Sequence, residues 1–300
     1  MPYADTPRRR YADTAFHIVA TFLLCWLVSV YLADLARADT LFESGAQRVS
    51  LLELYTSEGC SSCPPAEKWM AQLQNEKSLW KQVVPVAFHV DYWDGLGWKD
   101  RFAKRAYSAR QRDYANGWGT PSVYTPGFVL NGTEWKGWFD GQQLPTFESE
   151  KAGQLRVVLR GDQAEVVFDA PFEKNPLEVH FAPLAMRVAS DVRAGENRGS
   201  KLEHEFVATE LTSARLEFVN GKQTAHAVLP LSGARALAVW VTPREFAHAI
   251  TGHGRVPELG AVFVRCRWMD QRLRFERVVD IAKSVRWLPP CLTLRRALQR

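Results

Sequence analysis

Cys60 and Cys63, two cysteines separated by two residues, form the pattern in this 300-residue sequence with the clearest chemistry. They follow residues 49–55, an apolar run typical of a buried strand, and they precede Pro64 and Pro65. Proline suits the first turn of a helix, because the N–H that it lacks has no partner there. A helix N-terminus favours a thiolate, and the thiolate is the form that attacks a disulfide. The spacing therefore predicts a redox pair in which Cys60 is the nucleophile and Cys63 resolves the mixed disulfide.

The same pair has two other interpretations, which the residues alone leave open. It could form an inert structural disulfide, or it could bind a metal. A metal site needs further ligands, of which His89 is the nearest in sequence, and Pro64 occupies the position where haem attachment requires a histidine. We therefore predict no metal ligands and no cofactor, and we keep a metal (copper) chaperone as an alternative.

Strand and helix patterns alternate around the cysteine pair from about residue 48 to 155. A helix is predicted from the pair to about residue 77, a parallel strand over 83–90, a second helix over 100–115 and a last helix over 142–155. Asn131-Gly132 between apolar runs predicts a β-hairpin. The order is strand, helix, strand, helix, strand, strand, helix, with the last two strands antiparallel.

A proline just before the third strand, Pro126, occupies the position where thioredoxin-like folds keep a cis peptide facing the cysteines. We predict that Thr125-Pro126 is this peptide, with Thr120-Pro121 as the second choice. A cis peptide there shapes an edge on which an extended substrate chain can pair. Thr125, Trp93 and Trp98 are therefore candidate substrate-binding residues, although most tryptophans in this region are expected to pack against the sheet.

Several motifs around these residues resemble the secreted, thioredoxin-like family called domain of unknown function 1223. The matching segments are Leu54 to Pro65, Phe88 to Asp94, Leu96 to Asp100, Ala109 to Arg112, Val123 to Pro126, and Gly195 to Gly199 with Leu202 and His204. The resemblance implies a thioredoxin-like fold and export, and the family's name leaves the activity open. The segment 195–199 is either a binding loop or a turn held by hydrogen bonds of its Asn and Arg.

The chain departs from well-characterised thioredoxins at the acid that takes the proton of the second cysteine. Leu54 occupies that position, and Glu53 beside it points to the opposite face of a strand. Glu58 and Asp91 are the candidate replacements.

The sequence pattern changes at about residue 156, where the alternation of strand and helix patterns ends. Short β-prone runs separated by turn residues predict an all-β, sandwich-like domain over 156–282. The runs are 156–160, 165–169, 177–181, 215–219, 236–241, 261–268 and 272–279. The predicted fold class is an α/β thioredoxin-like domain over 48–155 followed by this β domain, α+β overall.

The N-terminal segment 1–38 is predicted to be an export signal. Three arginines precede an uncharged run over 18–33, and Ala36 and Ala38 suit a signal peptidase that cleaves after Ala38. The alternative is an uncleaved anchor over 18–33. Both place the protein in the periplasm or outside the cell, where disulfides persist. Whether Cys266 and Cys291 then pair with each other is left open.

The net charge of +5 is concentrated at the C-terminus, where the tail 283–300 contains Lys and Arg and no acidic residue. Such a tail is usually solvated, and a weak contact with a membrane surface is the more specific alternative. No phosphate loop, serine-hydrolase elbow or nucleotide fingerprint is present, and no nucleic-acid partner is expected. The sequence therefore predicts an exported thiol–disulfide oxidoreductase that acts on thiols or disulfides of envelope proteins and has a redox partner. A non-catalytic envelope binding module with a structural disulfide is the main alternative.

Overall fold

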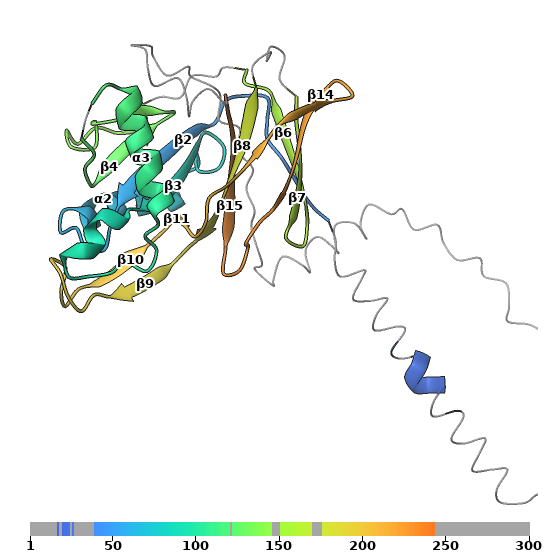
Figure 1. Cartoon of the computed structure of the whole chain (residues 1–300), viewed down its shortest axis with the longest axis horizontal. Coiled ribbons are helices and arrows are strands. Elements are labelled where there is room, and N and C mark those ends of the chain that lie inside the picture. The colour runs from blue at the N-terminus through green and yellow to red at the C-terminus, as the bar shows by residue number, and fades with distance from the viewer. Residues whose placement is uncertain are drawn as a thin grey trace, which may run out of the picture.

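The computed structural model describes residues 39–120, 122–145, 151–169 and 176–243, together with residues 17, 20–24 and 26. It shows an α+β protein in which a large mixed sheet carries two helices and faces a second, antiparallel sheet (Figure 1). The helices are α2 (Cys63–Gln72) and α3 (Arg105–Gly117), with the 3-10 turns η1 (Leu73–Asn75) and η2 (Asp91–Leu96). The strands are β1 (Thr40–Glu43), β2 (Ser50–Thr56), β3 (Val83–His89), β4 (Gly127–Leu130), β5 (Thr133–Glu134), β6 (Gln154–Arg160), β7 (Gln163–Asp169), β8 (Leu177–Ala185), β9 (Val188–Asp191), β10 (Lys201–His204), β11 (Val207–Ala208), β12 (Thr212–Arg215), β13 (Glu217–Val219), β14 (Lys222–Val228) and β15 (Ala236–Pro243).

The strands that position the cysteines lie inside an eight-stranded sheet with the order β12-β8-β11-β3-β2-β4-β5, and β15 pairs with β8. β2 and β3 are parallel, with Leu54 opposite Ala87, and every residue of both strands is buried. This burial accounts for their continuous apolar runs, since a parallel strand is covered on both faces. β4 runs antiparallel to β2 and turns into β5 at Asn131-Gly132, whose φ angles of 50° and 81° lie in the left-handed region. The predicted parallel crossover and hairpin are confirmed.

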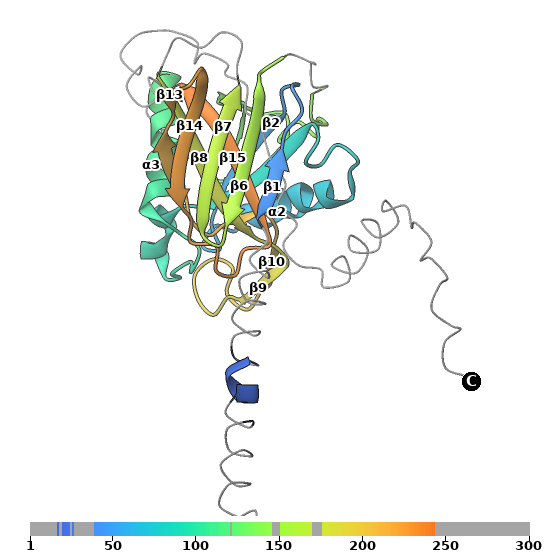
Figure 2. The same cartoon turned by 90° about the vertical axis from the view of Figure 1, so that its right-hand side faces the viewer.

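The second half of the chain contributes to both sheets. The order β1-β6-β7-β14-β13 forms a five-stranded antiparallel sheet whose inner face packs on one face of β8 and β15 (Figure 2). Alternate residues of β15 divide accordingly: Leu237 and Val239 enter this core, whereas Ala238 and Trp240 enter the core beneath α3. The β-rich part is therefore layered like a sandwich, but one layer is the extension of the sheet that holds β2 and β3.

The boundary expected near residue 155 marks a change of sequence pattern that the eight-stranded sheet crosses. Val207 of β11 pairs with Ala87 on one side and with Ala185 on the other. β11 thus covers the edge of β3 that the first half leaves open, and an exposed strand edge is a site for unwanted pairing.

The predicted helix over 142–155 is wrong where the structure describes it. Residues 142–145 are not helical, and Gln154 begins β6. Pro145 opposes a helix through it, and Gly153 has a φ of 105° that a helix does not accept. The helix expected over 100–115 begins at Arg105, because Lys104 before it is extended, and Asp100 instead accepts the N–H of Phe102 in a turn. The helix after the cysteines ends at Gln72 and continues only as η1 to Asn75.

Several predictions lie outside the described residues. These are the runs 261–268 and 272–279, Cys266 and Cys291, the basic tail 283–300 and most of the segment 1–38. Among the helices in the described part of the chain, none is long and apolar enough to cross a membrane.

Candidate functional site

Cys60 and Cys63 form a disulfide in the turn between β2 and α2, with their Cα atoms 5.5 Å apart. Cys63 is the first residue of α2, its N–H bonds to the carbonyl of Cys60, and prolines follow at the first helical positions as predicted. Cys60 lies three residues before the helix, in front of N–H groups that have no helical partner. Both cysteines are 0% exposed, so reagents reach the sulfur atoms only when the surroundings move.

Thr125-Pro126 is the cis peptide, as predicted, and it faces the cysteine pair. The Thr125 carbonyl oxygen lies 3.8 Å from Cys60 Sγ and 3.5 Å from the hydroxyl of Ser62. Trp93 Nε1 donates to Thr125 Oγ1 at 2.8 Å, and this bond fixes the side chain beside the cis bond. The structure therefore brings together Cys60, Thr125, Pro126 and Trp93.

A loop from the second half of the chain is fastened to the cysteine turn. It is the Gly195–Gly199 loop, which joins β9 to β10. Asn197 Nδ2 donates to the carbonyls of Glu58 and Cys60, each at 2.9 Å, and the side chain is only 8% exposed. Glu196 Oε2 accepts the N–H of Ser61 at 2.9 Å, which lowers the pKa of Glu196. The loop is thus a turn whose Asn side chain holds the backbone on either side of Gly59.

The neighbouring tryptophan fits closely against this loop. A Cβ on Gly195, whose φ is 73°, would lie 3.1 Å from Trp98 Cβ, so the position requires glycine for both conformation and space. Trp98 Nε1 donates to Glu58 Oε2 at 2.7 Å. Trp98, expected to bind substrate, therefore holds a buried carboxylate and the loop.

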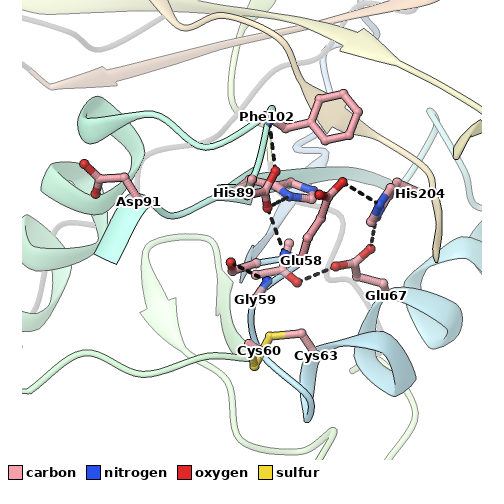
Figure 3. A network of polar contacts seen from close by, with 12 residues as sticks. Glu58, Gly59, Cys60, Cys63, Glu67, His89, Asp91, Phe102 and His204 are labelled. Atoms are coloured by element: carbon pink, nitrogen blue, oxygen red, sulfur yellow. Dashed lines mark hydrogen bonds and ion pairs between the residues drawn. A yellow bond between two sulfur atoms is a disulfide. The ribbon is translucent and has the colours of Figure 1, made fainter. Parts of the chain in front are cut away.

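Beside the disulfide lies a buried polar cluster that we call the Glu–His cluster: Glu58, Glu67, His89, Asp100 and His204. Figure 3 shows the side chains of Glu58, Glu67, His89 and His204 pointing toward one another. His204 Nδ1 donates to Glu67, and His204 Nε2 lies 3.3 Å from Glu58 Oε1. Glu67 also accepts the hydroxyl of Thr56 at the end of β2. Glu67 comes one helical turn after Cys63, so it occupies the same face of α2.

The contacts between His204 and the two glutamates shift the pKa values in this cluster. Burial alone would lower the pKa of His204, but the carboxylates of Glu58 and Glu67 outweigh burial and raise the pKa to about 10. Burial would raise the pKa of Glu58, yet its hydrogen bonds, with that from His204 foremost, lower the pKa. His204 is thus a cation between two carboxylates.

The second histidine of the cluster is held from one side only. His89 Nδ1 lies 2.6 Å from Asp100 Oδ2, and the same oxygen accepts the N–H of Glu58 at 2.8 Å. Burial opposes the ionisation of Asp100, but His89 and the backbone N–H groups of Glu58 and Phe102 lower its pKa. Asp100 therefore connects the strand end at His89 to the residue two places before Cys60.

Neither acid that we expected to take the proton of Cys63 is placed beside the sulfur. Figure 3 shows the Glu58 side chain extending toward His204, away from the disulfide, and Asp91 pointing away from the cluster. Asp91 accepts the hydroxyl of Ser108 instead. Glu53 lies on the opposite face as expected, where it forms a two-point ion pair with Arg110 of α3 at 2.8 Å.

Sequence reasoning missed the roles of Asn197, Glu67, Asp100 and His204. The spacing of Glu67 from Cys63, four residues in a helix, was an available signal for a shared face. Asn197, Asp100 and His204 were part of the motifs that carry the family resemblance, but only the fold brings residues 195–204 to the cysteine turn.

Comparison with family models agrees with that resemblance. The family model described as protein of unknown function (DUF1223) matches residues 51–242. No curated protein matches the chain. Among solved structures, protein AGR_C_4864 from Agrobacterium tumefaciens is 22% identical with a TM-score of 0.49, over 73% of this chain and 93% of that one. HBP35 of Porphyromonas gingivalis is 13% identical with a TM-score of 0.46, over 74% of this chain and 75% of that one. Since the family model covers more than half of its length, the chain belongs to the DUF1223 family.

Proposed function

We propose that this protein is an exported thiol–disulfide oxidoreductase with a thioredoxin-like core, and that it exchanges disulfides with envelope proteins. The observation that carries the proposal is the arrangement at the turn before α2. A Cys60–Cys63 disulfide faces the cis peptide Thr125-Pro126, with Cys60 Sγ 3.8 Å from the Thr125 carbonyl. The parallel pair β2 and β3, the antiparallel hairpin β4 and β5 and the helices α2 and α3 are consistent with a thioredoxin-like core.

In the reducing direction the reduced pair supplies two electrons. The Cys60 thiolate attacks one sulfur of a substrate disulfide, a mixed disulfide forms, and the other substrate sulfur leaves as a thiolate that takes up a proton. Cys63 then loses its proton and attacks Cys60 Sγ, which releases the second substrate thiol and forms the Cys60–Cys63 disulfide. The oxidising direction is the reverse, and a redox partner restores the starting state.

Access to Cys60 is the step that the surroundings control. Because both cysteines are 0% exposed, a substrate must displace neighbouring groups before it reaches the sulfur. The Gly195–Gly199 loop is the element fastened to the cysteine turn, through Asn197 to the carbonyl of Cys60 and through Glu196 to the N–H of Ser61. A substrate chain that binds beside Thr125 would replace these contacts with hydrogen bonds from its own backbone.

Trapping in the exported compartment tests the proposal. Cys63→Ser leaves Cys60 free to attack but prevents resolution, so the variant should accumulate mixed disulfides that disappear on reduction. Cys60→Ser is the matched control and should trap nothing. Absence of mixed disulfides with Cys63→Ser in correctly folded, exported protein would reject exchange. N-terminal sequencing of the same sample tests cleavage after Ala38.

The burial of the pair favours one second candidate, a binding module in which Cys60–Cys63 only fixes the turn. Complete burial of both cysteines is what a structural disulfide needs, because it keeps reductants away. In that case the envelope partner would bind elsewhere on the protein. The reduction potential of the Cys60–Cys63 pair distinguishes the two functions.

A further inference from the structure

The Glu–His cluster contains more acid than its histidines balance. Glu58, Glu67 and Asp100 are 0%, 8% and 2% exposed, and their ion pairs with described residues are formed with His89 and His204. Three carboxylates against two imidazoles leave a buried negative charge even when both imidazoles are protonated. An unbalanced buried charge is costly, and a bound metal ion is one of the ways in which proteins compensate it.

One nitrogen in this cluster lacks a partner. His89 donates or accepts at Nδ1 with Asp100, while its Nε2 is buried and has no hydrogen-bond partner among the described residues. His89 is 0% exposed, so solvent does not satisfy this atom. Glu58 Oε1 and His204 Nε2, by contrast, lie 3.3 Å apart and form an ion pair with each other. Buried polar atoms nearly always have a partner, so the unpartnered Nε2 of His89 requires an explanation.

The geometry of the cluster suits a metal ion. Glu67, His89 and His204 each offer one ligand atom, and these atoms lie within 4.8 Å of one another. Around a tetrahedral zinc ion with bonds of about 2.0 Å, ligand atoms lie about 3.3 Å apart, so small side-chain shifts close the site. In many metal sites a carboxylate that does not touch the metal is bonded to one nitrogen of a ligand imidazole and orients the ring. Asp100 is bonded to His89 Nδ1 in this way, which leaves Nε2 for the metal.

We propose that Glu67, His89 and His204 bind a divalent transition-metal ion, for which Zn²⁺ is the matching probe, and that a water molecule completes its coordination. The ion takes the place of the proton that His204 shares with Glu67. A divalent ion neutralises one more negative charge than that proton does. The site ties α2, the end of β3 and the end of β10 together directly behind the cysteine turn. It uses neither cysteine, so it is independent of the proposed redox function.

The test uses untagged, full exported protein with the Cys60–Cys63 disulfide intact, so that thiolates cannot bind the metal. After removal of metal with a chelator, Zn²⁺ is titrated in competition with a chromophoric chelator. We expect one equivalent to bind. Co²⁺ in the same protein should give the visible spectrum of a four-coordinate site with nitrogen and oxygen ligands and no thiolate charge-transfer band.

Matched variants locate the site. His89→Gln and His204→Gln should lose stoichiometric binding, whereas His226→Gln, at an exposed histidine of β14, should keep it. Asp100→Asn retains Glu67, His89 and His204 and should bind Zn²⁺ about 10–100-fold more weakly, which provides a test if the ligand variants do not fold.

Three outcomes would overturn the proposal. They are no stoichiometric uptake by the oxidised wild-type protein, uptake only after reduction that Cys63→Ser abolishes, or wild-type affinity in Asp100→Asn. The second outcome would assign the metal to the cysteines, in agreement with a metallochaperone.

Discussion

Asn197→Ala should make the Cys60–Cys63 disulfide much easier to reduce without unfolding the protein. Asn197 is one of two residues through which the Gly195–Gly199 loop holds the cysteine turn, and it donates hydrogen bonds of 2.9 Å to the carbonyls of Glu58 and Cys60. Since both cysteines are 0% exposed, a reductant must wait for this region to open. The substitution removes both bonds and leaves the fold of the two sheets untouched.

The magnitude follows from the number of bonds lost. A net contribution of about 1 kcal/mol for each hydrogen bond gives about 2 kcal/mol for the pair. When opening is fast and reversible, the reduction rate follows the population of the open form. A difference of 2 kcal/mol therefore raises the rate about 30-fold, because about 1.4 kcal/mol corresponds to a factor of ten.

The assay is the rate at which dithiothreitol reduces the disulfide, measured by alkylating the new thiols and weighing the protein. Asn116→Ala, at an exposed position of α3, is the control for loss of an asparagine and should react like the wild type. Urea unfolding of each variant shows whether the effect is local. An unchanged reduction rate in Asn197→Ala would refute the reasoning, and so would an increase explained entirely by loss of global stability.

Three further predictions concern other parts of the structure. Gly195→Ala should also speed reduction, since its φ of 73° and the 3.1 Å approach to Trp98 Cβ disfavour any side chain; the same alkylation assay tests this, and an unchanged rate would contradict it. Glu53→Gln should lower the free energy of unfolding by about 3–5 kcal/mol, because it leaves the charge of Arg110 without its buried partner; urea unfolding measures the loss, and a change below about 1 kcal/mol would contradict the ion pair. His180, between Ser213 and Thr242, has a pKa well below 6.5 because it is buried and because Arg110 lies near, with Glu178 as the facing acid. The unfolded chain then binds a proton below pH 6.5 that the folded protein does not, so stability falls as the pH falls, by up to about 1.4 kcal/mol per unit. His180→Gln should remove that part of the slope in urea unfolding between pH 6.5 and 5, and an unchanged slope would contradict a neutral His180.

The local features of the cysteine region could be predicted because local chemistry determines them. The buried strand before Cys60, the prolines that open α2 and the Asn131-Gly132 turn each depend on a few adjacent residues. The cis Thr125-Pro126 peptide was expected from the order of elements around it.

The remainder depends on contacts between distant residues, which a pattern in one sequence does not reveal. Val207 joins β11 to β3 across 120 residues of chain, and Asn197 reaches the carbonyl of Cys60 over a separation of 137. Glu58 could be named as an acid near the cysteines, but only the fold shows its carboxylate turned toward His204. The incorrect helix over 142–155 shows the opposite case, where a polar stretch with helical composition contains Pro145 and ends in a strand.

The reduction potential of the Cys60–Cys63 pair in the exported protein tests the central proposal most directly. Equilibration in glutathione buffers, followed by acid quenching and alkylation, gives the fraction of oxidised protein at each potential. Exchange with envelope proteins predicts a value between about −270 and −120 mV, where known oxidoreductases lie. A value below about −300 mV, typical of structural disulfides, would contradict it.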